Sequence, residues 1–283
     1  MKKKRKAAAH DFDATFLPKN RREQFGDLVK NRFSFFLRIG GLLLLGSVLF
    51  LLAYSAKYLL VLPAAQVALK QEDYLAFTHT NTLVFDGIYL IAFLPIGLTL
   101  GGVCRLIRLL AWGKGIFFWP DFWKGLRQNA KASSLLALLF GLFHGLNDFL
   151  FLAIPHPVFR YVPGGLGLLL LPLGMATLVV ASLYSSSFVA SLKGGLLVVA
   201  KSIGWVLLFL LFPFAWMTVS FIPYPVIRFL VDVVVIFALT PFVFVGWYLL
   251  CLNELDRTIN HRDYPAYENM GLQGEFLKSR KED

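Results

Sequence analysis

Ionisable and polar side chains within long hydrophobic segments are the residues of this sequence best placed to do chemistry. His144, Asn147 and Asp148 have i, i+3 and i+4 spacing, so they share one face of a helix. Arg228 and Asp232 are likewise four residues apart. Because a charge inside a bilayer is costly, such residues either form a functional site or pair with one another to join helices.

Two interpretations of this candidate intramembrane polar cluster stay open. Five of its charges fall at a similar predicted depth in the outer half of the membrane: Lys57, Asp86, Asp148, Arg228 and Asp232. In the first interpretation they line a polar vestibule that is open to the outside. In the second, which we favour, Arg228 pairs with Asp232 and Lys57 with Asp86, and these pairs only hold helices together.

Enzyme signatures do not occur in the sequence. It contains no His-Glu-x-x-His, no Gly-x-Ser-x-Gly and no phosphate-binding Gly-x-x-x-x-Gly-Lys-Ser/Thr. His144 with Asp148 suits a proton relay or, as we expect, a hydrogen-bonded core histidine. Cys104 and Cys251 lack the spacing of metal ligands and are interpreted as small apolar core residues. The sequence therefore predicts no catalytic residue, no metal and no cofactor.

Glycines at four-residue spacing indicate how two of the hydrophobic segments pack. Gly97 with Gly101, and Gly141 with Gly145, have the Gly-x-x-x-Gly spacing that lets membrane helices approach closely. We assign helix packing to these four glycines, and no catalysis. Their contact would turn the His144 face into the bundle.

A basic and aromatic segment is predicted to form an interfacial helix from Pro120 to Lys131. Proline suits a first helical turn, and Asp121 favours the positive end of the helix dipole. At about 100° per residue, one face carries Lys124, Arg127, Gln128 and Lys131, and the opposite face carries Trp119, Phe122, Trp123 and Leu126. We expect the three basic residues to face lipid phosphates or a protein partner.

The composition requires a membrane. Of 283 residues, 57% are hydrophobic and only 16% are charged, and the mean hydropathy is +0.65, so the polar surface of a water-soluble globule is lacking. The predicted fold is all-α and polytopic, with short interfacial amphipathic helices and six transmembrane helices, each long enough for a hydrocarbon core of roughly 30 Å. The predicted spans are Phe35 to Ala56, Leu83 to Val103, Ser133 to Ile154, Gly165 to Tyr184, Leu196 to Ile222 and Val226 to Leu250.

The distribution of basic residues orients the chain. Of 28 Lys and Arg, 24 lie in four alternate segments: through Arg38, and in Arg105 to Lys131, Lys193 to Lys201 and Arg257 to Lys281. Because cytoplasmic segments are enriched in Lys and Arg, both termini are expected in the cytoplasm and the protein in the plasma membrane. The same distribution accounts for the net charge of +11 without a nucleic-acid partner.

The spans also define an expected organisation. A basic cytoplasmic segment with a juxtamembrane helix, a transmembrane domain and a cytoplasmic tail would occupy residues 1–34, 35–252 and 253–283. A weak Leu-Pro-x-Gly repeat places Pro95 and Pro172 inside two spans, and Pro241 lies inside a third. Each proline frees a backbone carbonyl and favours a kink. Either the fold consists of three related helical hairpins, or prolines are simply common in membrane helices.

One stretch has a pattern of short acidic, aromatic and basic motifs. It contains Asp121-Phe122, Lys124-Gly125-Leu126-Arg127, Asn129 and Asp148, followed by basic and small residues from Ser182 through Lys201. From Gly97 to Phe212 the chain resembles the YesL-like bacterial integral membrane proteins, a family without an established biochemical activity. The resemblance implies an accessory role in carbohydrate uptake beside ABC-transport components. The turn from Ser187 to Gly194 lacks the Glu-Ala-Ala motif of sugar-importer permeases, which argues against a permease.

Three functions follow from these observations, in falling order of preference. The first is an accessory or assembly subunit of a transport system, with the lipid bilayer and ABC-transporter components or other membrane subunits as partners. The second is a small secondary transporter with an outward-facing polar vestibule. The third is a membrane enzyme that acts on lipid, for which the sequence offers no nucleophile and base.

Overall fold

The computed structural model describes residues 17–153, 162–184, 186–222 and 224–273, and within these ranges the chain is helical, with no strand. The all-α prediction is therefore confirmed for this part of the chain. The elements are α1 (Arg21–Asn31), α2 (Phe33–Ser55), η2 (Ala56–Val61), α3 (Leu62–Ala68), α4 (Gln71–Ala111), α5 (Phe118–Ala153), α7 (Val162–Leu183), α8 (Phe188–Lys201), α9 (Ile203–Met217), η3 (Thr218–Phe221), α10 (Pro225–Val234), η4 (Val235–Leu239), α11 (Thr240–Leu255), η5 (Asp256–Asn260), α12 (His261–Asp263) and η6 (Pro265–Tyr267).

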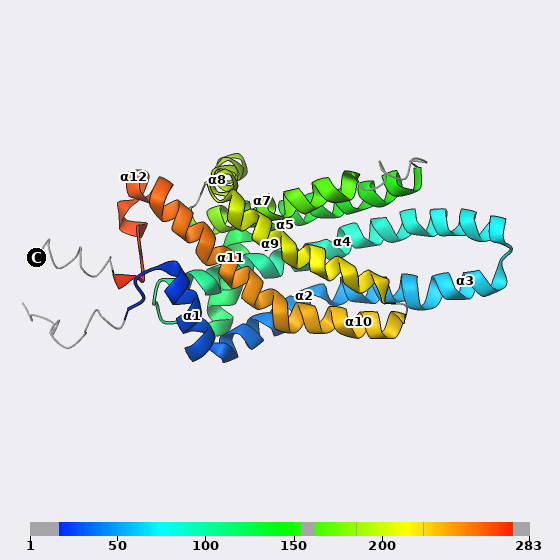
Figure 1. Ribbon diagram of the computed structural model, residues 1–283, viewed down its shortest axis with the longest axis horizontal. Coiled ribbons are helices and arrows are strands. Elements are labelled where there is room, and N and C mark those ends of the chain that lie inside the picture. Colours follow the sequence, from blue (N-terminus) through cyan, green and yellow to red (C-terminus); the bar gives the residue numbers. More distant parts are fainter. Residues whose placement is uncertain (1–16, 154–161, 185, 223, 274–283) are drawn as a thin grey trace, which may run out of the picture.

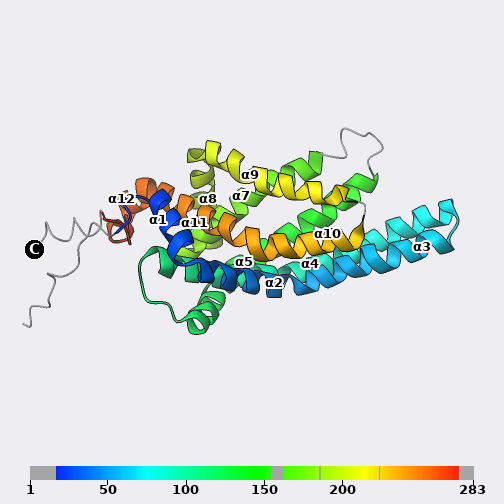
Figure 2. The same ribbon diagram turned by 60° about the horizontal axis from the view of Figure 1, so that its bottom comes forward.

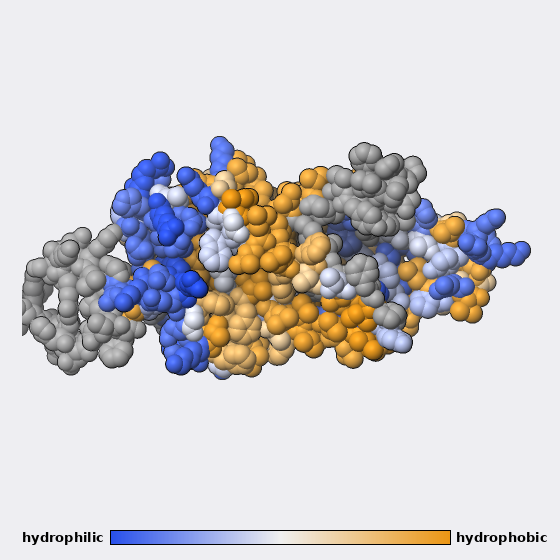
Figure 3. Space-filling view, viewed as in Figure 1, coloured by the Kyte–Doolittle hydropathy of each residue, from blue (hydrophilic) through white to orange (hydrophobic). Residues whose placement is uncertain are grey.

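Long apolar helices run along the molecule. Three stretches among the described residues are long and apolar enough to cross a bilayer: Phe33–Ala68, Gln71–Ala111 and Val226–Asp263. The bent pair α8 and α9 makes a fourth if it counts as one span. Figure 3 shows a band of apolar residues between hydrophilic residues at the two ends of the molecule. The chain thus has the helices of a membrane protein.

The helices form an elongated bundle with α1 and α12 at one end (Figure 1). The hairpin of α2, η2 and α3 with the start of α4 extends beyond the other helices at the opposite end, as Figures 1 and 2 both show. It turns at Leu69 and Lys70, between the end of α3 and the start of α4. The molecule therefore has a broad end, which carries the described parts of both terminal segments, and a narrow end.

The predicted fifth span, Leu196 to Ile222, is wrong at its start. Its first residues belong to α8, which meets α9 at an angle of 97°. Ser202 lies at the bend, where its hydroxyl donates to the Val198 carbonyl at 2.6 Å and its backbone leaves the helical conformation. Hydropathy alone could not detect this bend, because α8 is itself largely apolar.

The predicted interfacial helix, Pro120 to Lys131, is not a separate element. It forms the first turns of α5, a continuous helix of 36 residues. Within the predicted aromatic face, Phe122 is buried whereas Trp119 and Trp123 are about half exposed. Phe122 turns inward since Gly102 of α4 leaves room for its ring.

The four Gly-x-x-x-Gly residues all lie where α4 and α5 pack together. Gly97 and Gly101 face the Ser133 region of α5, while Gly141 faces Leu90 and Gly145 faces Asp86 of α4. Side chains at these positions would collide with, or press on, the partner helix. The close approach lets the Asn129 amide donate to the Gly101 carbonyl at 2.8 Å.

A π-helical segment, η4, interrupts the last long helix just before Pro241. Proline has no N–H to bond the carbonyl four residues earlier, that of Phe237. This carbonyl lies directly over Gly40 of α2, so close that a Cβ at Gly40 would overlap it. A different carbonyl of η4, that of Val235, accepts a hydrogen bond from the Thr240 hydroxyl at 3.0 Å. The sequence predicts that Pro241 frees a carbonyl and favours a kink. In the structure a π-helical turn precedes it, and the backbone of this turn contacts α2.

Candidate functional site

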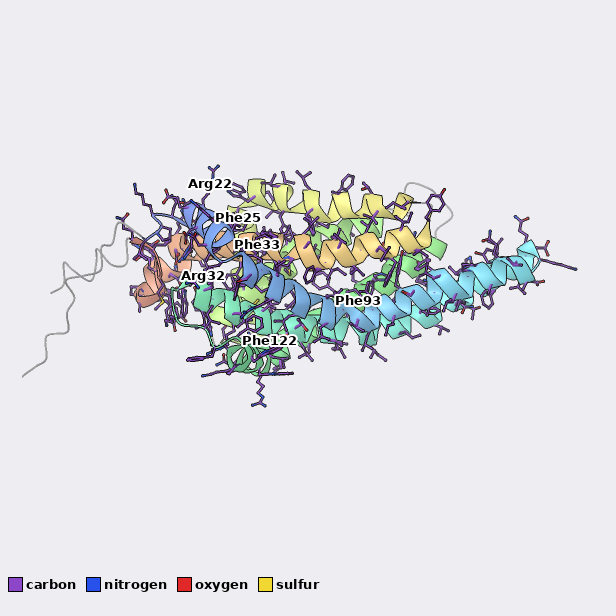
Figure 4. The ribbon with its side chains drawn as sticks, turned by 90° about the horizontal axis from the view of Figure 1, so that it is seen from below. Arg22, Phe25, Arg32, Phe33, Phe93 and Phe122 are labelled. Carbon is purple, nitrogen blue, oxygen red and sulfur yellow. The ribbon has the colours of Figure 1, made fainter. Side chains whose placement is uncertain are left out.

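A partly open cavity of about 620 Å³ lies in the bundle and is lined by residues of α2, η2, α4, α5, α7, α9, η3 and the α10–α11 helix. Its size falls within the roughly 300–1,000 Å³ of pockets that bind small molecules. Most of the lining is apolar, including Phe93, which Figure 4 labels on α4. The polar lining residues are Ser47, Tyr54, Tyr58, Tyr89, His144, Arg228, Asp232 and Thr240.

Arg228 of α10 faces two tyrosines across the cavity. Its guanidinium carbon lies 5.4 Å from the ring centre of Tyr54 and 5.5 Å from that of Tyr58. At these distances the negative ring faces attract the cation. Asp232 lies one helical turn further along α10 and also lines the cavity, so the site contains both signs of charge.

Lys57 directly precedes Tyr58 in η2, and its side chain is buried, with 2% of its surface exposed. Its ammonium is 5.1 Å from the ring centre of Tyr58 and 5.7 Å from that of Tyr89. The His144 ring packs against the Tyr89 ring at 5.5 Å. Tyr58 and Tyr89 therefore link Lys57 to the groups that line the cavity.

The π-helical geometry of η2 contributes to this arrangement. It carries Lys57 and Tyr58, and single π-helical turns inside α-helices occur frequently at functional sites. The second π segment, η4, supplies Ile236 to the same cavity. Two of the helices around the cavity are thus irregular where they border it.

The structure brings together only part of the predicted polar cluster. His144, Arg228 and Asp232 line the cavity. Asp86 lies outside the lining, buried against Gly145 between α4 and α5. Asn147 is half-buried on α5 and does not line the cavity, and the side chain of Asp148 lies outside the described part of the structure.

Three tyrosines of the cavity were missing from the sequence interpretation. Tyr54, Tyr58 and Tyr89 carry the ring contacts of both cations. A signal for two of them was present, because Tyr54 and Tyr58 are four residues apart and therefore share a helix face. Tyrosine in a membrane helix is ordinarily assigned to the membrane–water interface, so this spacing was not interpreted as part of a site.

A buried polar network at the broad end was also missed. Arg21 of α1 and Asp256 of η5 form an ion pair at 2.8 Å, with 4% and 5% of their side chains exposed. Arg21 also donates to the Gln24 side chain at 2.9 Å and to the Met270 carbonyl at 3.0 Å. Asn260 donates to the other oxygen of Asp256 at 2.8 Å.

This network attaches both terminal segments to the bundle. The Gln24 amide donates to the Ala111 carbonyl at the end of α4 at 2.7 Å, and the Tyr184 hydroxyl at the end of α7 donates to Asn260. The predicted boundary between residues 252 and 253 falls inside the helical stretch Val226–Asp263. The described parts of the predicted N-terminal segment and C-terminal tail therefore pack on the transmembrane domain.

The segment from Asp121 to Asn129 docks α5 onto α4. Asp121 accepts from the Arg105 guanidinium at 3.2 Å, and both side chains are largely buried. Phe122 packs over Gly102, and the Asn129 amide donates a hydrogen bond to the Gly101 carbonyl. The predicted basic surface, by contrast, is exposed at all three positions, Lys124, Arg127 and Lys131.

Replacing Asp121 by Ala should reduce the free energy of unfolding by about 1.5–3 kcal/mol, the range for hydrogen bonds to charged groups. The change removes the acceptor for Arg105 and for the Phe117 N–H, which Asp121 accepts at 2.9 Å. Denaturation of the purified protein in detergent measures the loss. The control is Lys124→Ala, because Lys124 is exposed on the same helix, and equal stability of the two variants would contradict the docking role of Asp121.

No protein-family model, no curated protein and no solved structure matches this chain, so the resemblance to the YesL-like family stays a prediction.

Proposed function

We propose that this chain is a multi-pass plasma-membrane protein with six spans and both termini in the cytoplasm. The described helices account for three to four spans by length and composition. Helices α5 and α7, with 36 and 22 residues, would complete the six, since about 1.5 Å per residue makes each longer than a core of roughly 30 Å. The basic segments at the broad end support a cytoplasmic position for that end.

A cysteine at Thr80 should react with a membrane-impermeant thiol reagent added to intact cells, whereas a cysteine at Lys124 should react only after the inner face is opened. Both positions are exposed. Thr80 is near the start of α4 and Lys124 near the start of α5, and these two helix starts lie at opposite ends of the bundle (Figure 1). Background labelling should be low, because Cys104 and Cys251 are fully buried. Labelling of Lys124→Cys in intact cells would contradict the proposed orientation and place the broad end outside.

The proposed biochemical role is the binding of a small polar solute in the bundle cavity, as part of a transport system. The single observation that carries this role is the 620 Å³ cavity with His144, Arg228, Asp232 and three tyrosines in an otherwise apolar lining. Aromatic rings suit the apolar faces of a solute, and the opposite charges of Arg228 and Asp232 in the lining suit its hydrogen-bonding groups. A neutral or zwitterionic solute of about the size of a sugar fits this lining best.

Within that role, an accessory subunit of a carbohydrate transport system is the first candidate. The sequence has no ATP-binding motif, so ATP-driven transport would need a partner. A surface for such a partner, or for lipid, is the exposed basic face of Lys124, Arg127 and Lys131, which has the half-exposed Trp119 and Trp123 beside it. Tryptophan next to basic side chains is typical of the membrane–water interface.

Partner recovery tests this candidate. Affinity purification in mild detergent, followed by mass spectrometry, should recover an ATPase or permease subunit in stoichiometric amount. The variant with Lys124, Arg127 and Lys131 all changed to Glu should lose most of it, while an equal charge reversal at three exposed basic residues elsewhere, Lys193, Lys201 and Arg262, should not. If the unaltered chain were recovered without any ATPase or permease subunit, the result would count against the accessory role.

A small secondary transporter is the second candidate, and the irregular helices η2 and η4 beside the cavity favour it. Broken membrane helices at a central binding site are a feature of such proteins. Purified chain in proteoliposomes should then accumulate a solute without any partner, and Arg228→Gln should abolish the accumulation while the protein stays folded. Uptake that needs a second subunit would contradict the secondary transporter and favour the accessory role.

A further inference from the structure

A second cavity, of about 780 Å³, lies between α1, α9 and α11 near the broad end of the bundle. Its apolar wall comes from α9 and α11, together with Phe25 of α1. The apolar lining includes Phe25, Trp205, Leu208, Phe209, Phe212, Phe242, Val243, Trp247, Leu249 and Leu250. In Figure 4 the labels Arg22 and Phe25 mark α1 where it lies beside α9 and α11.

One end of this groove is charged. Three arginines and one glutamate line it, which leaves an excess of positive charge: Arg21, Arg22, Arg257 and Glu254. Arg21 is neutralised by Asp256 at 2.8 Å, as described above. Arg257 is 3.6 Å from Glu254 and its side chain is 70% exposed. Arg22 is exposed and makes no hydrogen bond or ion pair with any residue that the structure describes.

The groove also lies near the border between the hydrophilic broad end of the molecule and its apolar band. Figure 3 shows the hydrophilic end of the molecule meeting the apolar band, and the groove lining changes from charged to apolar residues in the same direction. Trp205 is half exposed at the groove, as expected of a side chain at the headgroup level. A molecule bound here would thus have its polar part at the arginines and its apolar part against α9 and α11.

We propose that this groove binds an anionic phospholipid of the inner leaflet. Arg22 and Arg257 hold the phosphate, because a guanidinium donates two parallel hydrogen bonds to phosphate oxygens. One acyl chain lies along the apolar wall. The proposal does not depend on the function of the bundle cavity, since the two cavities present different polar groups.

The test uses the full chain in nanodiscs of phosphatidylcholine to which phosphatidylglycerol is added in rising proportion. Native mass spectrometry of the released protein should show retained phosphatidylglycerol in preference to phosphatidylcholine. Arg22→Gln with Arg257→Gln should weaken retention by about 10- to 30-fold, because one basic residue at an anionic surface contributes about fivefold. The matched control is Lys193→Gln with Lys201→Gln, which removes the same charge at two exposed positions outside the groove and should leave retention unchanged.

A second pair of variants tests the acyl chain. Gly246 lines the groove, and a Cβ there would make only ordinary contacts with the Phe25 ring, so Gly246→Leu should fill the groove without unfolding the protein. It should abolish selective retention, whereas Gly204→Leu, which meets no atom within 4 Å, should not. Equal losses in the groove arginine variant and in the control lysine variant, or full retention in Gly246→Leu, would overturn the proposal. Equal retention of the two lipids would overturn it as well.

Discussion

Replacing Asp256 by Ala should lower the free energy of unfolding by about 3–5 kcal/mol, the usual cost of removing one partner from a buried ion pair. The loss is large because Arg21 is only 4% exposed and would keep its charge in a site without a counter-ion. Asn260 would lose its acceptor at 2.8 Å in the same variant. Denaturation of the purified protein in detergent measures this change.

The matched control is the exposed ion pair of Arg262 and Asp263, which is seven residues further along the chain. Its side chains are 79% and 42% exposed, although its hydrogen bond is as short, at 2.8 Å. Asp263→Ala should therefore leave stability unchanged, since solvent replaces the lost interaction. If Asp256→Ala were as stable as Asp263→Ala, the network would not attach the terminal segments to the bundle.

Replacing Gly40 by Ala should destabilise the protein by about 1–3 kcal/mol, the cost of overpacking a well-packed core. The added methyl group would overlap the carbonyl of Phe237, which is backbone and cannot rotate away. Helices α2 and η4 would have to separate. Since both border the bundle cavity, we also expect Gly40→Ala to weaken solute binding there.

Gly41→Ala is the control for this prediction. A Cβ at Gly41 meets no atom within 4 Å, and Ala is a better helix former than Gly by about 1 kcal/mol. Gly41→Ala should thus be neutral or slightly stabilising. A Gly40→Ala variant as stable as Gly41→Ala would contradict the backbone contact between α2 and the π-helical turn.

Composition and periodicity were sufficient for the class of fold but not for its irregular parts. Apolar length predicts a membrane helix because every buried peptide group must bond within its own helix. The glycine spacing likewise located the contact of α4 with α5, since the pattern acts through local geometry. The bend at Ser202 was missed because hydropathy does not distinguish a helix across the membrane from one at an angle of 97° to it.

The sites depend on contacts between distant residues, and this is why the sequence predicted them only in part. His144, Arg228 and Asp232 attract attention because charge is rare in apolar segments. Arg21 and Asp256 lie in polar segments, where charge is common, so nothing in either segment indicates their pairing. Arg22 is similarly inconspicuous in sequence, and only the position of α1 beside α9 and α11 gives it an apolar neighbourhood.

The central proposal is that the bundle cavity binds a solute. In the proposed orientation the narrow end of the bundle faces outside, so we expect the solute to enter from there, and cysteine accessibility tests this most directly. Ser47→Cys is a nearly isosteric change in the cavity lining, while Ala53→Cys lies further along α2, toward the narrow end of the molecule, and outside the lining. Both side chains are buried, with 6% and 8% exposed, so only access through the cavity distinguishes them. A membrane-impermeant thiol reagent added outside should modify Ser47→Cys and leave Ala53→Cys unmodified. Failure to modify Ser47→Cys from outside, or equal modification of both, would contradict the claim.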